Sequence, residues 1–351
     1  MRRRRLLAVL LGLAVSAVFV YLAVRGLDLS AIEAAFARAE LFPWLPLGVA
    51  SYLCSHVVRG LRLRVLVRRH ADLRPVAATQ IVVIGCAANN VLPARLGELV
   101  RSGMLTERAA MPLAQSITVT FIERVLDGII LLLLLVLATA TVEVSGWMQD
   151  LVYVALAVFG MATVAMVGAA QAPRLLVEIA SRVTRPLGAR WQARFVNLAT
   201  SVANAGACLR HPVDAALLLV LSLGAWCLEA GMYLALLPTF GLSVEWQVGL
   251  ATMCVTSFGI LLPSSPGAIG PYHYFASQSL IVFGVAAPTA LAYATLVHLA
   301  FYLPVTIWGA AAMLWYGVQL DGTSAPRDAA PRTTASQTAA SQAAAPRPEE
   351  P

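Results

Sequence analysis

Six apolar stretches, most of them separated by short polar loops, constrain what this chain can fold into. A helix needs about 20 consecutive apolar residues to cross the hydrocarbon core of a bilayer. Backbone that faces lipid must satisfy its own hydrogen bonds, which a helix does within one segment. The stretches therefore predict an all-α polytopic membrane protein. They are Leu6–Val24, Pro43–Val58, Leu113–Val142, Leu151–Ala170, Val213–Leu237 and Thr289–Val318.

The composition supports this prediction and excludes two other classes of protein. Hydrophobic residues make up 59% of the 351 residues and charged residues only 12%, whereas a soluble domain has about 25% charged residues. An ordinary soluble enzyme and a disordered chain are both excluded. The net charge of +7 comes from arginine alone, since the chain has no lysine. In a membrane protein this charge sets orientation, so we expect no nucleic-acid partner.

Arginine is distributed unevenly between the loops. The N-terminus has four arginines, residues 59–74 have six, residues 94–111 have three and residues 171–212 have six, against two in residues 25–42. Loops rich in arginine stay in the cytoplasm. We therefore expect an uncleaved first span and both termini in the cytoplasm. The short Pro43–Val58 span should extend towards Val65, with its arginines snorkelling to the membrane surface.

Two further apolar stretches run into proline–glycine breaks. Val76–Pro93 continues into residues 94–111, and Val244–Pro263 continues into residues 264–285. The loop assignments make the first a re-entrant hairpin from the cytoplasm and the second a re-entrant hairpin from outside. Six spans and two hairpins then form an inverted-topology repeat, a plan common among secondary transporters. The alternative is eight to ten full spans.

The predicted domain covers residues 1–320, with halves of about 1–142 and 143–320. Both breaks share the pattern L-P-x-x-x-G, at Leu92–Gly97 and Leu262–Gly267. Residues 321–351 are rich in Ala, Pro, Ser and Thr and predict a disordered cytoplasmic tail.

Two loops contain short amphipathic patterns. Ser30 and Glu33 form a capping-box pattern at the start of a helix. Trp191, Phe195, Leu198 and Val202 recur at helical spacing. Each segment predicts a helix that lies flat at the lipid surface or packs on the protein itself.

Charge in the middle of an apolar span is the strongest functional signal. Glu123, Arg124 and Asp127 lie within Leu113–Val142, and each charge at the bilayer centre costs at least about 2.5–3.5 kcal/mol. Glu123 and Asp127 are four residues apart and share a helix face. The group must face a protein or water-filled interior. It is either an ion-paired clamp between helices or part of a pathway for a substrate or protons.

The first break offers a site for an anion. Asn89 and Asn90 precede the turn, and Arg95, Glu98 and Arg101 then share one face of a helix that begins near Ala94. Helix N-termini bind anions, and arginine binds phosphate with two parallel hydrogen bonds. The alternative is a hairpin turn capped by asparagine.

The second break carries hydroxyls and unshielded backbone N–H groups that suit a phosphate or a sugar. The candidate residues there are Ser264, Ser265, Gly267 and Gly270, and the helix-breaking positions in the two hairpins are Pro93, Gly97, Pro263 and Pro266. Glu229 is a further intramembrane acid and a candidate partner for Arg124 or His298. His273 and His298 are expected to be core histidines.

We find no motif that indicates catalysis, a cofactor or a metal site. The five cysteines have no metal-ligand spacing. The sequence therefore predicts a protein that is not an enzyme, although a membrane transferase that uses Glu123 or Asp127 stays an alternative.

Three motifs together resemble the transmembrane region of the lysylphosphatidylglycerol synthase/flippase family. They are residues 89–101 (NNVLPARLGELVR), 123–128 (ERVLDG) and 262–270 (LPSSPGAIG). The resemblance covers about Leu6 to Val318 and implies lipid translocation across a bacterial cytoplasmic membrane. It implies functional positions at Asn90, Pro93, Arg95, Gly97, Glu98, Arg101, Glu123, Arg124, Asp127, Pro263, Pro266, Gly267 and Gly270. The aminoacyl-transferase domain of the lysylphosphatidylglycerol enzymes has no counterpart here, so synthase activity is not expected.

The leading hypothesis is a lipid flippase for a polar, phosphate-bearing headgroup or a lipid-linked glycan. The expected partners are membrane lipids and a lipid-modifying synthase or glycosyltransferase. The alternatives are a membrane partner that holds a lipid for such a synthase, and an integral transferase. Sequence alone leaves the lipid, the direction of transport and the oligomeric state open.

The opposed hairpins make a first prediction. In a cysteine-free background, Ala94→Cys should react with an impermeant thiol reagent from the cytoplasmic side and Ser264→Cys from the outer side. Labelling of both positions from the same side would contradict the inverted repeat.

Overall fold

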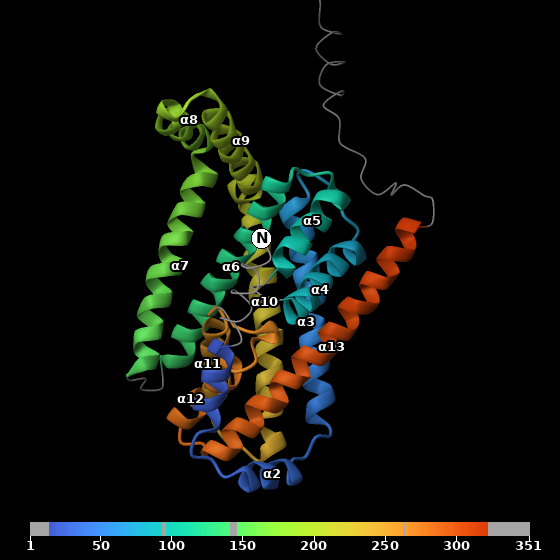
Figure 1. The fold of residues 1–351 in the computed structure, drawn as a ribbon, viewed down its shortest axis with the longest axis vertical. Helices are drawn as coiled ribbons and strands as arrows, with labels where there is room; N and C mark the ends of the chain where they lie inside the picture. The colour runs from blue at the N-terminus through green and yellow to red at the C-terminus, as the bar shows by residue number, and fades with distance from the viewer. Residues whose placement is uncertain (1–13, 93–95, 141–145, 263, 322–351) are drawn as a thin grey trace, which may run out of the picture.

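The structure is a computed structural model that describes residues 14–92, 96–140, 146–262 and 264–321. Within those residues it is helical, with no strand. Five long helices form the body of the molecule, and the last of them crosses it obliquely to the long axis (Figure 1). They are α3 (Trp44–Val67), α6 (Leu113–Thr139), α7 (Trp147–Gln171), α10 (Pro212–Leu236) and α13 (Ala287–Asp321). With the helix Ala14–Val24, they confirm that each of the six predicted spans contains a helix.

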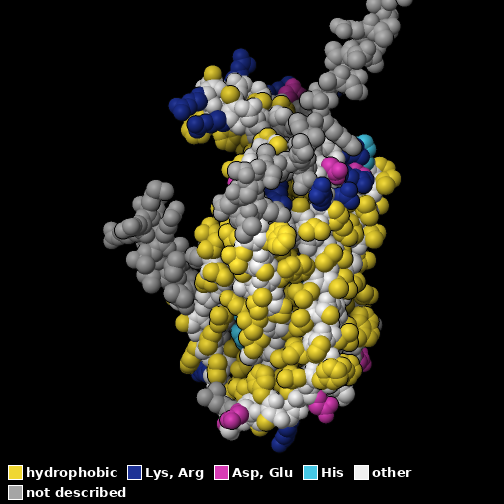
Figure 2. Space-filling model, turned by 90° about the vertical axis from the view of Figure 1, so that its right-hand side faces the viewer, with side chains coloured by type: hydrophobic (Ala, Val, Ile, Leu, Met, Phe, Trp, Pro, Cys, Tyr) yellow, Lys and Arg dark blue, Asp and Glu magenta, His cyan; other side chains and the backbone are white. Residues whose placement is uncertain are grey.

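Three described helices are long and apolar enough to cross a membrane by length and composition alone. These are α7, α10 together with the 3₁₀ turn η4 (Pro238–Phe240), and α13 as far as Trp315. α3 and α6 are of similar length, at 24 and 27 residues, but each contains three charged residues. Figure 2 shows hydrophobic side chains covering the visible side of the body between two ends where charged side chains gather. This belt is what a protein surrounded by lipid requires.

α3 ends at Val67, nine residues beyond Val58 and two beyond Val65, towards which the span was expected to extend. Arg59 and Arg62 therefore lie inside a helix, and both are buried within the protein. The prediction that the arginines at this end snorkel to the membrane surface was wrong for these two, because buried carboxylates on other helices pair with them.

Two pairs of short helices occupy the places of the predicted hairpins. α4 (Pro75–Val91) and α5 (Gly97–Ala109) lie in the upper half of the molecule, and α11 (Trp246–Gly259) and α12 (Pro271–Val282) in the lower half (Figure 1). A helix of 17 residues, the length of α4, is about 26 Å long, less than the hydrocarbon thickness of about 30 Å. The helices of each pair are thus short enough for a re-entrant hairpin. The break residues Pro93, Arg95 and Pro263 lie outside the described residues.

The described arginine-rich segments gather at one end of the molecule. α5, α8 (Pro173–Thr184) and α9 (Ala189–Ala205) lie at the upper end, and α2 (Leu29–Ala37) at the lower end (Figure 1). A short 3₁₀ turn, η2 (Arg185–Leu187), joins α8 to α9, and another, η3 (Gly206–Arg210), joins α9 to α10. The predicted tail, beyond Asp321, is outside the described residues.

The two amphipathic segments differ from each other. In α2 the N-cap is Asp28 and not Ser30: the Asp28 carboxylate accepts hydrogen bonds from the Ser30 hydroxyl (2.8 Å) and backbone N–H (2.9 Å). These hydrogen bonds lower the pKa of Asp28. Phe36 packs edge-on against Phe240, with ring centroids 5.7 Å apart, so α2 packs on the protein. The second segment, which contains Trp191 and Phe195, forms α9. The helix that packs against it, α8, was not predicted.

α3 is central to the packing, because it lies against α4, α10 and α13. Glycines allow this close approach, as in many membrane helices. A Cβ atom on Gly60 would lie 2.7 Å from Cα of Thr79 on α4. At Gly60 the backbone of α3 therefore lies directly against the backbone of α4.

This contact makes a prediction. Gly60→Ala should force α3 and α4 apart and destabilise the protein by about 1–3 kcal/mol, measured as a lower thermal unfolding temperature in detergent. The matched control is Gly224→Ala on α10, where a Cβ atom would meet nothing closer than 4.0 Å. Equal stability of the two variants would contradict the packing.

Candidate functional site

The charged residues of α6 lie where the sequence predicts them, but they differ in exposure. Glu123 and Asp127 are buried, with relative exposures of 0% and 4%. The side chain of Arg124, one position round the helix from Glu123, is 41% exposed. The two carboxylates therefore face the protein interior, and Arg124 lies at its rim.

Two arginines of α3 complete the cluster, and sequence reasoning missed both of them. Arg62 is fully buried and donates to Asp127 (2.5 Å) and to the hydroxyl of Ser222 (3.1 Å). Arg59 donates to Glu229 at 2.6 Å, and its guanidinium lies 4.5 Å from the centre of the Trp226 ring. We had counted these arginines as loop residues that set orientation. The apolar residues that follow them up to Val67 were the signal that the helix continues.

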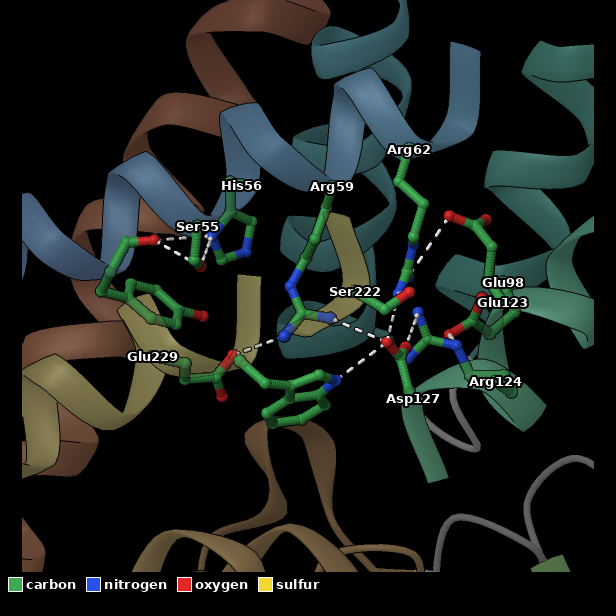
Figure 3. Close-up of polar contacts among 12 residues, drawn as sticks. Ser55, His56, Arg59, Arg62, Glu98, Glu123, Arg124, Asp127, Ser222 and Glu229 are labelled. Atoms are coloured by element: carbon green, nitrogen blue, oxygen red, sulfur yellow. Dashed lines mark hydrogen bonds and ion pairs between the residues drawn. The ribbon is translucent and has the colours of Figure 1, made fainter. Parts of the chain in front are cut away.

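Asp127 is the centre of the cluster (Figure 3). Besides Arg62, it contacts Arg59 at 3.4 Å and Arg124 at 3.2 Å, and it accepts a hydrogen bond from the Trp226 indole N–H at 3.0 Å. These partners come from α3, α6 and α10. One carboxylate thus ties three helices together.

α5 supplies the other side of the cluster. Arg101 pairs with Glu123, and Glu98 lies 3.9 Å from Arg124. Asn89, at the end of α4, donates to Glu98 at 3.4 Å. The prediction that Glu98 and Arg101 lie on one face is confirmed, since both reach α6. Gly97, at the start of α5, packs against α4: a Cβ atom there would lie 2.2 Å from the Gly85 carbonyl oxygen.

We call these eight residues the charge network. Its formal charge is zero, because it contains four arginines and four carboxylates. They are Arg59, Arg62, Arg101, Arg124, Glu98, Glu123, Asp127 and Glu229. Such balance is needed where charges leave water, since an unpaired buried charge is very costly.

The side chains at the centre of the charge network are buried, and those at its edges are partly exposed. The side chains of Arg62 and Glu123 are 0% exposed. Those of Arg124, Glu98 and Glu229 are 41%, 26% and 16% exposed. Arg124 and Glu98 together form a rim where a polar group could enter. Glu229 pairs with Arg59, so the expected pairing of Glu229 with Arg124 or His298 was wrong.

The second break forms a separate polar cluster around His298. One ring nitrogen of His298 lies 3.0 Å from the carbonyl oxygen of Gly267, and the other lies 3.5 Å from the His273 ring. The prediction of core histidines fits His298, which is buried, whereas His273 is half-buried. The two rings also contact each other, and His298 contacts the break. Gly267 and Gly270 have φ of 71° and 99°, a region that favours glycine.

The helix Ala14–Val24 closes part of this break. The backbone N–H of Ser265 donates to the hydroxyl of Ser16 at 2.9 Å, and Gly270 lies against the Ser16 backbone. The N–H of Ser265 is therefore satisfied within the protein. Ser264 and Pro266 are half-buried.

The two breaks meet at α13. Asn90 donates to Thr306 at 2.8 Å, and the Tyr302 hydroxyl donates to the Asn90 carbonyl oxygen at 3.4 Å. Gly267 lies against the same Tyr302 ring. Asn90 thus binds α13, whereas its neighbour Asn89 binds the charge network. Among the residues that the structure describes, no group of His, Cys, Asp or Glu could hold a metal ion.

The charge network makes a prediction about stability. Asp127→Ala should remove the nearest carboxylate from the buried Arg62, leaving it only Glu123 at 3.4 Å. The loss should cost about 3–5 kcal/mol, seen as a large drop in thermal unfolding temperature in detergent. Asp72→Ala is the control, because the Asp72 side chain is 83% exposed and surface pairs contribute up to about 1 kcal/mol. A small effect of Asp127→Ala would mean that the cluster is hydrated and loosely held.

Comparison with known proteins places this chain in a family. Neither the comparison with curated proteins nor that with solved structures finds a significant match. A family model described as "Lysylphosphatidylglycerol synthase TM region" matches residues 9–309. That range includes all eight residues of the charge network and both breaks. The chain belongs to the family of the lysylphosphatidylglycerol synthase transmembrane region.

Proposed function

We propose that this protein translocates a lipid with a polar, phosphate-bearing headgroup across the bacterial cytoplasmic membrane. The observation that carries the proposal is the charge network, which is neutral and buried at its centre but open at Arg124 and Glu98. Family membership supports a lipid-related function in a membrane.

The headgroup enters at the rim formed by Arg124 and Glu98. Arg124 is half-exposed, and its contacts with Glu98 (3.9 Å) and Asp127 (3.2 Å) are longer than the 2.5 Å contact of Arg62 with Asp127. A guanidinium held this loosely can turn to a phosphate and bind it with two N–H groups. Glu98 then faces any amine or hydroxyl of the headgroup. The acyl chains stay in the bilayer, beside the hydrophobic belt of Figure 2.

The helix pairs α4–α5 and α11–α12 provide the moving parts in this proposal. They lie in opposite halves of the molecule (Figure 1), as expected for inverted repeats that expose a site alternately to each side. Asn90 and Gly267, one from each break, both contact Tyr302. Tyr302 of α13 therefore links the two hairpins, so a shift of either one would change the contacts of the other. The arginine-rich end is the cytoplasmic end, and both termini are cytoplasmic.

The proposal includes no chemical step. The carboxylates of Glu123 and Asp127, which a transferase would use, are each held by buried arginines. They are poorly placed to act as free bases. A purified protein that formed product from a lipid and a donor would favour the transferase instead.

Proteoliposomes containing a headgroup-labelled anionic phospholipid test the proposal. Arg124→Ala should slow translocation about tenfold or more, because a hydrogen bond to a charged group is worth about 1.5–3 kcal/mol. Arg124→Lys should retain part of the rate, since it keeps the charge but loses the paired N–H groups.

The matched control is Arg64→Ala, which removes a partly exposed arginine paired with Asp72 at 3.4 Å. It should translocate lipid at the unaltered rate. If Arg124→Ala lowers thermal stability but translocation stays normal, the charge network is a structural clamp and the headgroup model fails. Absence of translocation by the unaltered protein, with copurification of a synthase, would favour the lipid-holding partner.

A further inference from the structure

The α8–α9 pair is the part of the described structure least explained by lipid translocation. It overhangs the body at its arginine-rich end (Figure 1). α8 packs mainly on α9, while α9 also packs on α6, and the buried residues of α9, such as Ala199 and Ala205, lie in its C-terminal half. An open cleft of about 530 Å³, lined in part by Val177 and Val196, separates the two helices. Most of α8 and the first half of α9 therefore have little protein cover.

Both helices expose a continuous apolar stripe. On α8 the stripe is Leu175, Ile179 and Val183, at four-residue spacing and 49–67% exposed. On α9 it is Trp191, Phe195 and Leu198, 41–50% exposed. Six exposed large apolar side chains on two short helices would be unfavourable in water.

Basic residues flank the stripes. Residues 173–205 contain five arginines and one acid, Glu178, which gives a net charge of +4 from +5 and −1. Glu178 is itself paired with Arg182 at 2.6 Å. The guanidinium of Arg194 lies 5.3 Å from the centre of the Trp191 ring. In Figure 2 the overhanging part carries hydrophobic side chains on its underside and arginine on its top and outer edge.

We propose that the α8–α9 pair is a membrane-surface anchor that binds the anionic headgroups of the bilayer in which the protein sits. The apolar stripes enter the boundary between headgroups and acyl chains, with Trp191 at the level where tryptophan is enriched. The arginines neutralise lipid phosphates around the stripes. The apolar underside of the α8–α9 pair points towards the hydrophobic belt around the spans. The surface of one bilayer would therefore contact both. A soluble acidic protein would complement the charge but would not explain this continuity.

Hydrogen–deuterium exchange of the full chain in vesicles tests the anchor. Backbone exchange across residues 173–198 should be about tenfold slower or more in vesicles of phosphatidylserine and phosphatidylcholine than in phosphatidylcholine alone, because each arginine near an anionic surface adds to binding. High salt should remove the difference, because it screens charges at the surface. α10 serves as the internal reference.

A charge variant separates the anchor from simple packing. Joint replacement of Arg185, Arg190 and Arg194 by glutamine, all exposed residues, should abolish the slowing by phosphatidylserine and leave exchange in α10 unchanged. The same replacement of Arg64 and Arg108 should keep the slowing. Equally fast exchange of residues 173–198 in both vesicles would overturn the proposal, because the pair would then be free for a soluble partner. Equally slow exchange would also overturn it, because headgroup charge would then have no part. Neither outcome depends on lipid translocation.

Discussion

The rest of the structure depends on the ion pairs and the hydrogen bond that the buried Asp127 carboxylate makes. The carboxylate faces Arg59 and Arg62 of α3, Arg124 of its own helix and the indole N–H of Trp226 on α10. Removing the carboxylate from water is costly, and several charged partners repay that cost only when the helices stand in one arrangement. Asp127 thus fixes how α3, α6 and α10 pack, and its neighbours link that core to α5.

Neutrality explains how so many charges lie among apolar helices. Four arginines balance four carboxylates, so the cluster as a whole carries no formal charge into the membrane. The same balance limits what the site can bind. A phosphate would enter only where an arginine can leave a carboxylate, and the exposed fraction is 41% for the Arg124 side chain and 0% for that of Arg62. Our proposal therefore assigns headgroup binding to the edge of the cluster and helix packing to its centre.

Sequence patterns predicted much of the fold and all of the charge network except Arg59 and Arg62. Six apolar stretches correspond to helices, and the four-residue spacing of Glu123 and Asp127 correctly placed both carboxylates on one face. Arg59 and Arg62 were missed because a helix with arginine at its end looks like a loop when its partners are unknown. The pairing of Glu229 with Arg59 could not be predicted, since it joins residues 170 positions apart. The cap at Asp28 was missed because Asp28 and Ser30, two positions apart, are both residue types that cap helices.

The central claim is that a headgroup binds at the rim of the charge network, and an experimental structure in a lipid nanodisc tests it most directly. With an anionic phospholipid present, we expect headgroup phosphate density about 3 Å from the Arg124 guanidinium, while Arg62 stays paired with Asp127. A rim covered by protein side chains, with headgroup density elsewhere, would contradict the claim.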